Sequence, residues 1–560
     1  MRPTLSLSAP LLLAVTLGCA HGESKPVQAS AAPAPTQAVV LGSAVGVDGK
    51  PVTLAQVHLG SHSYPVNADG TFRLESAPVG YAKVRFSAVN HAEAETSLWL
   101  DPGEHRVEVK LGTHPRADSI EKVGLIIEKN GKLSMKAAIP MQRREDGTFA
   151  LTVEAPAGRF AYQLLHATTS GNTMNGTQAD RFEYDGGGDY LSVLDAPGGP
   201  LEVVFDPRKL PAANGQSSLT LAHPLDQQVA QLVADLEELE AGIQQAGLAA
   251  SKSGGDVKAA VQAFLAGDPH QQAFLSALAT EQNPAIRQVL LVAAQSEFVP
   301  GAESTRLADA ALTEIEAGAT VWGINPGALV SMANAASDPA LAKTYVDSVI
   351  ASHPVADVSA AALLHRLRLA ITAGDTATAE ASFTELTTRF PASLYAFLAN
   401  RLNPTAPVQP GALVPQFSFP RWEKPQEKIT PASLKGKTYL ISLWASWCKP
   451  CIAKLPTLHA LQARYGKQGF TVVAVAIQDK WDAVQTFRQD NAQKWPMPWQ
   501  HAYVPEDQAD AVMKQLSAVG LPSSILVGPD GKILATNTQV DEEGLEKLVE
   551  AAMAQRASGR

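Results

Sequence analysis

The chain has 560 residues, of which 45% are hydrophobic and 18% are charged, and its net charge is −10 at pH 7. At about 150 residues per domain, this length predicts roughly four domains. The acidic balance, with no cluster of basic residues, excludes nucleic acid as an expected partner. The three cysteines, Cys19, Cys448 and Cys451, are too few for a secreted protein that relies on disulfides for its stability.

The N-terminus is typical of an export signal. Arg2 precedes an apolar stretch from Leu5 to Leu17, which is too short to span a membrane. The sequence "TLGCA" that follows resembles a bacterial lipobox, although Thr16 stands where that pattern has leucine. The resemblance implies that residues 1–19 are a signal peptide with a lipidation site.

The lipobox resemblance further implies that Cys19 becomes the lipidated mature N-terminus. The alternative is an ordinary signal peptide cleaved nearby, which would leave Cys19 in the discarded part or as a free thiol. Ala20 is not the aspartate associated with inner-membrane retention, so the expected anchor is the outer membrane, at the periplasmic cell envelope. Residues 20–37, rich in Ala, Pro and Ser, predict a flexible linker.

Residues 38–214 are predicted to form two β domains. In residues 38–113, "VDGK" and "ADGT" place Asp-Gly turns between strand-prone segments. The order of "GKPVTLAQVHL", "NADGTFRL" and "PVGYAKVRFSA" resembles a carboxypeptidase regulatory-like, transthyretin-like β-sandwich. Residues 114–214, with "EDGTFALTVEAPAGRFAYQLL", predict a second β-rich domain of sandwich type.

An acidic, glycine-rich segment, "DRFEYDGGGDY", allows two interpretations. The carboxylates of Asp180, Glu183, Asp185 and Asp189 could gather around calcium, or the segment could be a turn between strands. The spacing does not match an EF-hand loop, which favours the turn. We therefore expect no metal in the chain.

Residues 224–403 are rich in Ala, Leu, Gln and Glu, with apolar residues at helical spacing. Asp338 to Pro354 and Asp375 to Pro391 align with a period of 37 residues, and Asp268 to Pro284 keeps the terminal Asp and Pro. Aspartate favours helix starts and proline favours helix ends, so each segment predicts one capped helix. The period is typical of a tetratricopeptide-like helical array, and a plain helical bundle is the alternative.

Strand and helix patterns alternate in residues 411–556, which predicts a layered α/β domain. "KTYLISLWASW" is an apolar strand that ends at Cys448, and a helix is expected from about Lys449 to Tyr465. "FTVVAVAI" is typical of a buried central strand. "LPSSILV" and "GKILAT" predict a strand pair, and "DEEGLEKLVEAAMA" predicts a closing helix.

The segment "WASWCKPC" places Cys448 at the start of the predicted helix. Unpaired N–H groups and the positive end of the helix dipole would stabilise a thiolate there. Pro450 is tolerated in the first turn, and Cys451 would lie one turn further in and more buried. A structural zinc would need a second ligand pair, and a structural disulfide across so short a loop would stabilise little. A redox pair is the hypothesis that these residues favour, with Cys448 attacking a disulfide and Cys451 resolving it.

The stretches "PQFSFP", "SLKGKTYLISLWASWCKPC" and "VGLPSSILVGPDGKI" resemble thioredoxin, and more closely the TlpA/ResA branch of exported thioredoxin-like oxidoreductases. The resemblance implies a cis bond before Pro522 and an exposed Trp447 beside Cys448. It implies no cofactor other than the redox-active Cys448–Cys451 disulfide.

Two carboxylates common in these families are absent. Ser442 stands where thioredoxins bury an aspartate, and Lys454 stands where the TlpA/ResA branch often has a glutamate. Lys449 lies inside the motif itself. Less negative and more positive charge would favour the Cys448 thiolate, so these positions are expected to tune the reduction potential.

The multidomain chain is thus predicted to be an exported disulfide oxidoreductase of reductase type. Expected partners are protein thiols and disulfides, a membrane or periplasmic thiol donor of electrons, and the outer membrane through the lipid anchor. The sequence does not determine whether electrons flow from this chain to its substrates or from the substrates to this chain. The alternatives are a thiol peroxidase, disfavoured by Ala445 where peroxiredoxins have threonine, and an envelope binding protein with a vestigial redox domain.

Overall fold

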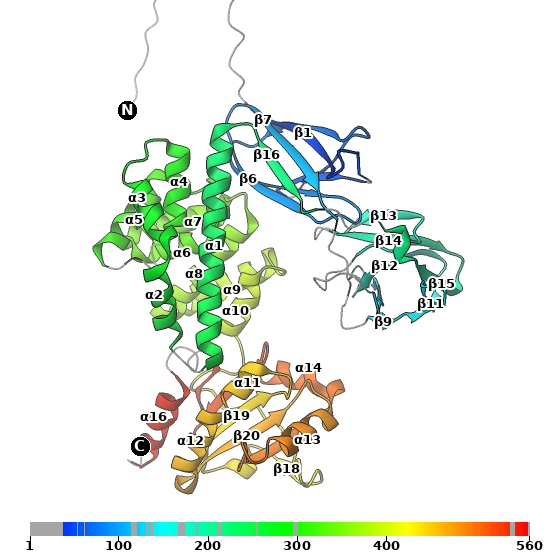
Figure 1. The fold of residues 1–560 in the computed structure, drawn as a ribbon. Coiled ribbons are helices and arrows are strands. Elements are labelled where there is room, and N and C mark those ends of the chain that lie inside the picture. The colour runs from blue at the N-terminus through cyan, green and yellow to red at the C-terminus, as the bar shows by residue number, and fades with distance from the viewer. Residues whose placement is uncertain are drawn as a thin grey trace, which may run out of the picture.

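The computed structural model describes residues 37–557 with short gaps (Figure 1). The gaps are residues 53, 61, 114–119, 130, 132, 134–137, 166–173, 186–188, 211–214, 254–255, 295–298, 300 and 538–543. The predicted signal, Cys19 and most of the predicted linker therefore lie outside the described residues. Within them, no helix is both long and apolar enough to cross a bilayer.

The first β region consists of two four-stranded sheets, ordered β16-β7-β1-β4 and β3-β2-β5-β6, whose buried faces share one core. Its strands are β1 (Ala38–Gly46), β2 (Gln56–Leu59), β3 (His62–Pro65), β4 (Thr71–Ala77), β5 (Gly80–Ser87), β6 (Ala94–Leu100), β7 (Gly103–Leu111) and β16 (Ser218–Leu221). Gly49 and Gly70 have positive φ in the predicted Asp-Gly turns, a conformation that glycine adopts without strain. The region exceeds the predicted 38–113 because β16, from a distant part of the chain, pairs with β7.

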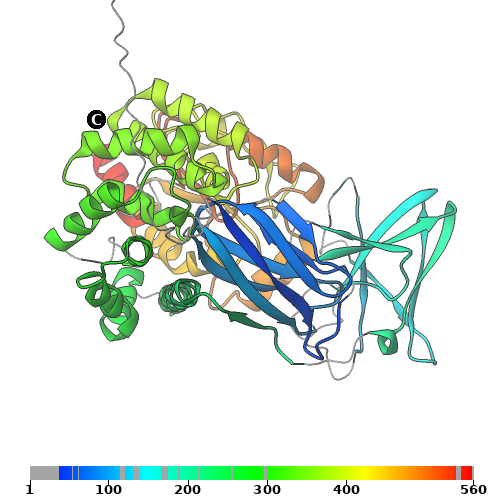
Figure 2. The same cartoon turned by 90° about the horizontal axis from the view of Figure 1, so that it is seen from above.

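The second β region has a five-stranded sheet, ordered β13-β14-β12-β8-β9, and a three-stranded sheet, ordered β10-β11-β15. The strands are β8 (Gly124–Ile127), β9 (Ile139–Pro140), β10 (Gln142–Arg143), β11 (Phe149–Ala155), β12 (Gly158–Leu165), β13 (Arg181–Tyr184), β14 (Tyr190–Ala196) and β15 (Gly199–Phe205). Seen from above, this region lies beside the first β region on the side away from the helices (Figure 2).

The acidic segment at residues 180–190 contains β13 and the first residue of β14, which pair antiparallel, and its residues 186–188 lie outside the described part of the chain. Its carboxylates already have protein partners: Glu183 pairs with Arg159 and Arg181, and Asp180 accepts the Asp195 N–H. Two of the four carboxylates that the calcium interpretation needs are thus engaged by protein groups.

The helical region begins with α1, a helix of 30 residues that runs from the first β region towards the α/β domain (Figure 1). The helices are α1 (Pro224–Ser253), α2 (Val257–Gly267), α3 (Pro269–Leu278), α4 (Pro284–Ala293), α5 (Ala302–Glu314), α6 (Pro326–Ala335), α7 (Pro339–Ser352), α8 (Ala356–Ala373), α9 (Thr376–Arg389) and α10 (Leu394–Ala399). Asp268, Asp338 and Asp375 cap α3, α7 and α9 with their carboxylates, as the aligned segments predicted. Pro284, predicted to end a helix, instead begins α4, where its missing N–H costs little.

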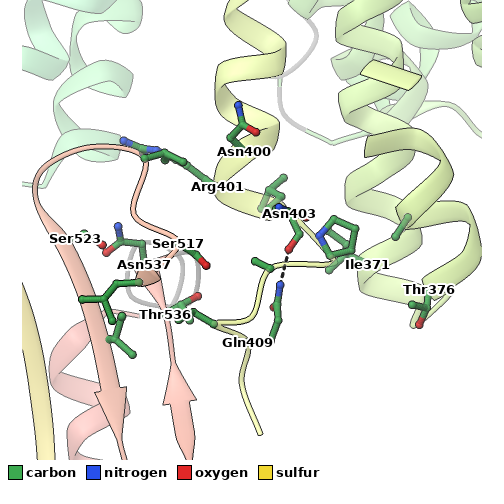
Figure 3. A pocket seen from close by; sticks show the side chains of 18 of the residues that line it. Ile371, Thr376, Asn400, Arg401, Asn403, Gln409, Ser517, Ser523, Thr536 and Asn537 are labelled. Atoms are coloured by element: carbon green, nitrogen blue, oxygen red, sulfur yellow. Dashed lines mark hydrogen bonds between the residues drawn. The ribbon is translucent and has the colours of Figure 1, made fainter. Parts of the chain in front are cut away.

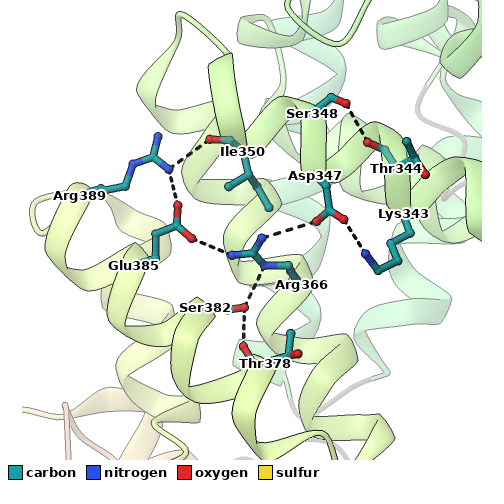
Figure 4. Close-up of polar contacts among 10 residues, drawn as sticks. All are labelled: Lys343, Thr344, Asp347, Ser348, Ile350, Arg366, Thr378, Ser382, Glu385 and Arg389. Atoms are coloured by element: carbon teal, nitrogen blue, oxygen red, sulfur yellow. Dashed lines mark hydrogen bonds and ion pairs between the residues drawn. The ribbon is translucent and has the colours of Figure 1, made fainter. Parts of the chain in front are cut away.

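A polar network joins α7, α8 and α9 (Figure 4). The Arg366 guanidinium donates to Ser382 at 3.0 Å and to Glu385 at 2.8 Å, and it lies 3.5 Å from Asp347. Glu385 also pairs with Arg389. One guanidinium on the middle helix thus fixes the register of both neighbours.

The α/β domain has a five-stranded sheet in the order β21-β20-β19-β22-β23. Its elements are β17 (Phe419–Pro420), β18 (Lys428–Ile429), β19 (Thr438–Trp444), α11 (Lys449–Ala453), α12 (Leu455–Tyr465), β20 (Phe470–Ala476), α13 (Trp481–Asp490), β21 (Gln500–Tyr503), α14 (Glu506–Gln515), β22 (Ser523–Val527), β23 (Ile533–Ala535) and α16 (Leu545–Ala557). β19 and β20 are parallel and buried at every position, which explains their continuous apolar sequences.

The helix predicted from Lys449 to Tyr465 is two helices, α11 and α12, that meet at Lys454. Pro456 lies in the first turn of α12, where it lacks the N–H that would have continued α11. The prediction of a single helix was therefore wrong at this point.

Candidate functional site

The cysteine pair lies where β19 leaves the centre of the sheet. Cys448 is the N-terminal capping residue of α11, and Cys451 is in its first turn. The two form a disulfide, and the Cys448 Sγ accepts the Cys451 N–H at 3.2 Å. A sulfur at a helix N-terminus that accepts a backbone N–H is favourably placed to carry negative charge.

The two cysteines are buried to similar extents. Cys448 is 2% exposed and Cys451 is 5% exposed, and both belong to the core cluster around Trp444. The expectation that Cys451 would be the more buried is therefore wrong for the disulfide form, in which the S–S bond holds both sulfurs in one cluster. Burial does not distinguish the attacking sulfur from the resolving one, but their positions on α11 do.

The residues around the pair lie close to their expected places. Trp447 is 58% exposed, and its indole N–H donates to the Gln478 carbonyl at 2.8 Å. Lys449 and Pro450 are exposed on α11, and Lys454 is partly exposed. Both lysines are thus more exposed than the buried cysteine pair.

Ser442 is buried on β19. Side chains alternate between the faces of a strand, so Ser442 shares a face with Leu440 and Trp444, which pack in the same cluster as both cysteines. The sequence correctly placed a neutral group on the cysteine side of the sheet.

The Leu521–Pro522 bond is cis, the geometry that the thioredoxin resemblance implied. Asn537 holds this segment: its side-chain oxygen accepts the Ser524 N–H at 2.6 Å, and its NH₂ group donates to the Pro522 carbonyl at 3.3 Å. Ser523 pairs with Leu443 across β22 and β19, which places the segment at the end of β19 that leads to Cys448. Asn537 was not predicted, because a lone asparagine after a strand carries no distinctive pattern.

Asp479 is a second residue that sequence reasoning missed. It is 7% exposed, and its carboxylate accepts the N–H of Ser446 at 2.6 Å and that of Lys480 at 2.8 Å. The site therefore contains a buried carboxylate. It binds the backbone N–H of Ser446, which lies two residues before Cys448 in the chain. The available signal was its position two residues after "FTVVAVAI", because neighbouring parallel strands bring their carboxyl ends to one edge of a sheet.

An aromatic cluster supports the Asp479 segment. Trp422 and Trp481 stack with ring centroids 3.8 Å apart, and Tyr503 meets Trp481 edge-on at 5.1 Å. The Tyr503 hydroxyl donates to the Asp479 carbonyl at 3.0 Å. These tryptophans are packing residues, and they fix the loop beside Trp447.

Asp479→Ala should destabilise the α/β domain by about 1–3 kcal/mol, because the Ser446 N–H would lose its charged acceptor. Denaturant unfolding followed by tryptophan fluorescence measures this. Asp482→Ala, which removes an exposed carboxylate from α13, is the matched control and should change stability by less than about 0.5 kcal/mol. Equal effects of the two substitutions would show that Asp479 does not hold the active-site loop.

A cavity of about 270 Å³ lies between the helical region and the α/β domain (Figure 3). Asn400, Asn403 and Gln409 approach it from the helical side, and Ser517, Ser523 and Asn537 from the α/β side. The Gln409 amide donates to the Asn403 carbonyl. The cavity thus adjoins the segment that follows the cis proline.

Residues 409–552 match the Redoxin family. The chain is 29% identical over 108 residues to thiol-disulfide oxidoreductase ResA of Bacillus thuringiensis subsp. konkukian, and this alignment covers 19% of the chain and 58% of that relative. ResA of Geobacillus thermodenitrificans is 26% identical over 151 residues, 27% of the chain and 82% of the relative.

Among solved structures, a thiol-disulfide oxidoreductase from Bacteroides fragilis aligns with a TM-score of 0.22 and 26% identity, covering 25% of this chain and 98% of that one. The Redoxin match spans the Cys448–Cys451 disulfide. Residues 409–552 are therefore a Redoxin-family domain with a TlpA/ResA-like thioredoxin fold.

Proposed function

We propose that the chain is an exported thiol–disulfide oxidoreductase that acts on protein disulfides through Cys448 and Cys451. The observation that carries the proposal is the cysteine pair at the N-terminus of α11, in which the Cys448 sulfur accepts a helix N–H. The ResA relatives are named for this activity, and the Redoxin match spans both cysteines.

The reaction follows from the order of the two sulfurs. In the reduced chain, the Cys448 thiolate attacks a substrate disulfide, forming a mixed disulfide and releasing one substrate thiolate. The Cys451 thiolate then attacks the Cys448 sulfur, which releases the second substrate thiolate and leaves the Cys448–Cys451 disulfide. The substrate gains two electrons, the pair loses two, and an external thiol donor restores the reduced form.

Ala445 argues against the peroxidase alternative. It lies three residues before Cys448, is 0% exposed and offers no hydroxyl to hold peroxide. Insulin reduction driven by dithiothreitol tests the proposal against this alternative. The proposal predicts catalysed insulin reduction without consumption of hydrogen peroxide, whereas thiol-dependent peroxide consumption without insulin reduction would contradict it.

The β and helical regions are proposed to space and dock the redox domain, with α1 as the spacer and the tetratricopeptide-like helices as the docking element. The cavity beside Ser523 supports contact of the helical region near the redox site. This arrangement would let protein substrates meet both parts of the chain at once.

The lipid anchor is a further part of the proposal, resting on "TLGCA" and the Ala/Pro-rich linker. The mature chain should begin at Cys19 and carry acyl chains, since two or more chains give stable membrane association where one is marginal. Mass spectrometry of the mature N-terminus measures this, and Cys19→Ala should release the protein from outer-membrane fractions. An unmodified N-terminus beyond Cys19 would contradict the anchor.

A further inference from the structure

Two histidines and an aspartate meet where the first β region joins α1. Asp101, His105 and His223 each place a potential ligand atom within 4.8 Å of the others. His105 is on β7, Asp101 is in the turn before β7, and His223 lies between β16 and α1. The cluster is far along the chain from the redox cysteines.

The strand register explains why the two imidazoles meet. β16 and β7 are antiparallel with Leu221 opposite Val107, so two residues further along His223 falls opposite His105. Side chains at opposed positions of an antiparallel pair project to the same side. The ring centroids are 4.8 Å apart.

A buried carboxylate fixes the orientation of His105. His105 is 0% exposed, and its Nδ1 lies 2.7 Å from the carboxylate of Asp226, which is also 0% exposed. The second carboxylate oxygen of Asp226 accepts the Trp99 N–H at 3.0 Å. With Nδ1–H donated to Asp226, the lone pair of a neutral His105 is on Nε2, as in histidines that bind metal through Nε2.

Three polar groups of Asp101 surround that Nε2: two oxygens and one N–H donor. It lies 3.1 Å from the Asp101 carboxylate and 3.0 Å from the Asp101 carbonyl, and the Asp101 N–H donates to it at 3.2 Å. The Nδ1 of His223 is buried and has no hydrogen-bond partner. One carboxylate oxygen of Asp101 and one ring nitrogen of each histidine lie within 4.8 Å of one another. A cation bound there would replace the Asp101 N–H as the partner of the Nε2 lone pair.

We propose that Asp101, His105 and His223 form a binding site for a divalent metal ion of the zinc class. Two imidazoles and one carboxylate leave a fourth position for water, the ligand set of open zinc sites. Bonds of about 2.0–2.1 Å would draw the ligand atoms together by up to about 1.5 Å, which rotation of the partly exposed His223 and Asp101 side chains permits.

The site would clamp the first β region to the helical region. Its ligands come from a β-turn, a strand of the sheet and the residue that precedes α1, so metal binding would link the two regions at the base of the long helix. Metal bound to the folded state alone would raise the thermal stability of the chain.

Titration of the mature chain with Zn²⁺ and Co²⁺, with no reductant so that Cys448 and Cys451 stay in the disulfide, tests the site. We expect one equivalent of Zn²⁺ by calorimetry, a higher melting temperature, and a Co²⁺ visible spectrum without thiolate charge-transfer bands. His223→Ala and Asp101→Asn, both at partly exposed positions, should abolish these signals. Asp226→Asn should weaken the affinity about 10- to 100-fold.

His62→Ala removes an exposed histidine from β3 of the same region and should leave metal binding unchanged. An absence of heat and of a melting shift with either metal would overturn the proposal and assign the cluster to a doubly protonated His105 held between two carboxylates. Binding that survives both His223→Ala and Asp101→Asn would equally overturn it, because the metal would then be held elsewhere.

Discussion

Cys448→Ser should reduce the chain's catalysis of disulfide exchange to the uncatalysed rate. The proposed mechanism has one attacking sulfur, at the N-terminus of α11, and a serine hydroxyl is not ionised at neutral pH. Cys451→Ser should also stop turnover, but it should retain the first attack and accumulate a mixed disulfide on Cys448. The insulin assay measures the rates, and mass spectrometry locates the adduct.

Ala453→Ser, an exposed substitution on the same helix, is the control and should retain full activity. The similar burial of the two cysteines makes this comparison informative, because accessibility does not decide which sulfur attacks. An adduct on Cys451 in the Cys448→Ser variant, with none on Cys448 in the Cys451→Ser variant, would reverse the assigned roles.

Ser442→Asp should lower the reduction potential by at least about 30 mV. The new carboxylate would be buried on the cysteine face of β19, where negative charge destabilises the Cys448 thiolate and hence the reduced form. One unit of thiolate pKa corresponds to about 1.4 kcal/mol, or about 30 mV for a two-electron couple. A buried carboxylate also offers a proton acceptor to Cys451, so mixed disulfides should be shorter-lived.

Ser442→Asn, neutral and of the same shape as aspartate, is the matched control and should leave the potential near that of the wild type. Lys449→Glu, at an exposed position, should lower it by only about 7–20 mV per charge, since an exposed charge contributes about 0.3–1 kcal/mol. Equal potentials for Ser442→Asp and Ser442→Asn would show that charge at this position does not set the potential.

Local sequence patterns predicted the turns, helix caps and strands that depend only on neighbouring residues. The Asp-Gly turns, the aspartate caps and the fully apolar strands β19 and β20 follow from single-residue conformations and from burial on both faces of a sheet. The position of the cysteine pair was predictable because a strand, Cys-x-x-Cys and a helix are contiguous. Trp447 was correctly placed in solvent beside that pair.

Local sequence patterns could not predict which strands pair when they lie far apart in the chain. β16 pairs with β7 of the first β region although more than a hundred residues separate the two strands. The four residues of β16 contain no pattern that would identify β7 as the neighbouring strand. Asp479 and Asn537 act on the site through backbone hydrogen bonds made across the sheet edge, which residue type alone does not reveal. The break at Lys454 was visible in principle, because Pro456 interrupts the helical pattern.

The central claim, that Cys448–Cys451 is a working redox couple, is tested most directly by equilibrating the wild-type chain in glutathione buffers and counting the free thiols of these two residues. We predict a reversible two-electron transition with a midpoint less reducing than thioredoxin's value of about −270 mV, because Ser442 adds no buried charge and Lys449 favours the thiolate. A disulfide that stays closed in these buffers, with a potential below about −300 mV, would identify a structural bond and contradict the account.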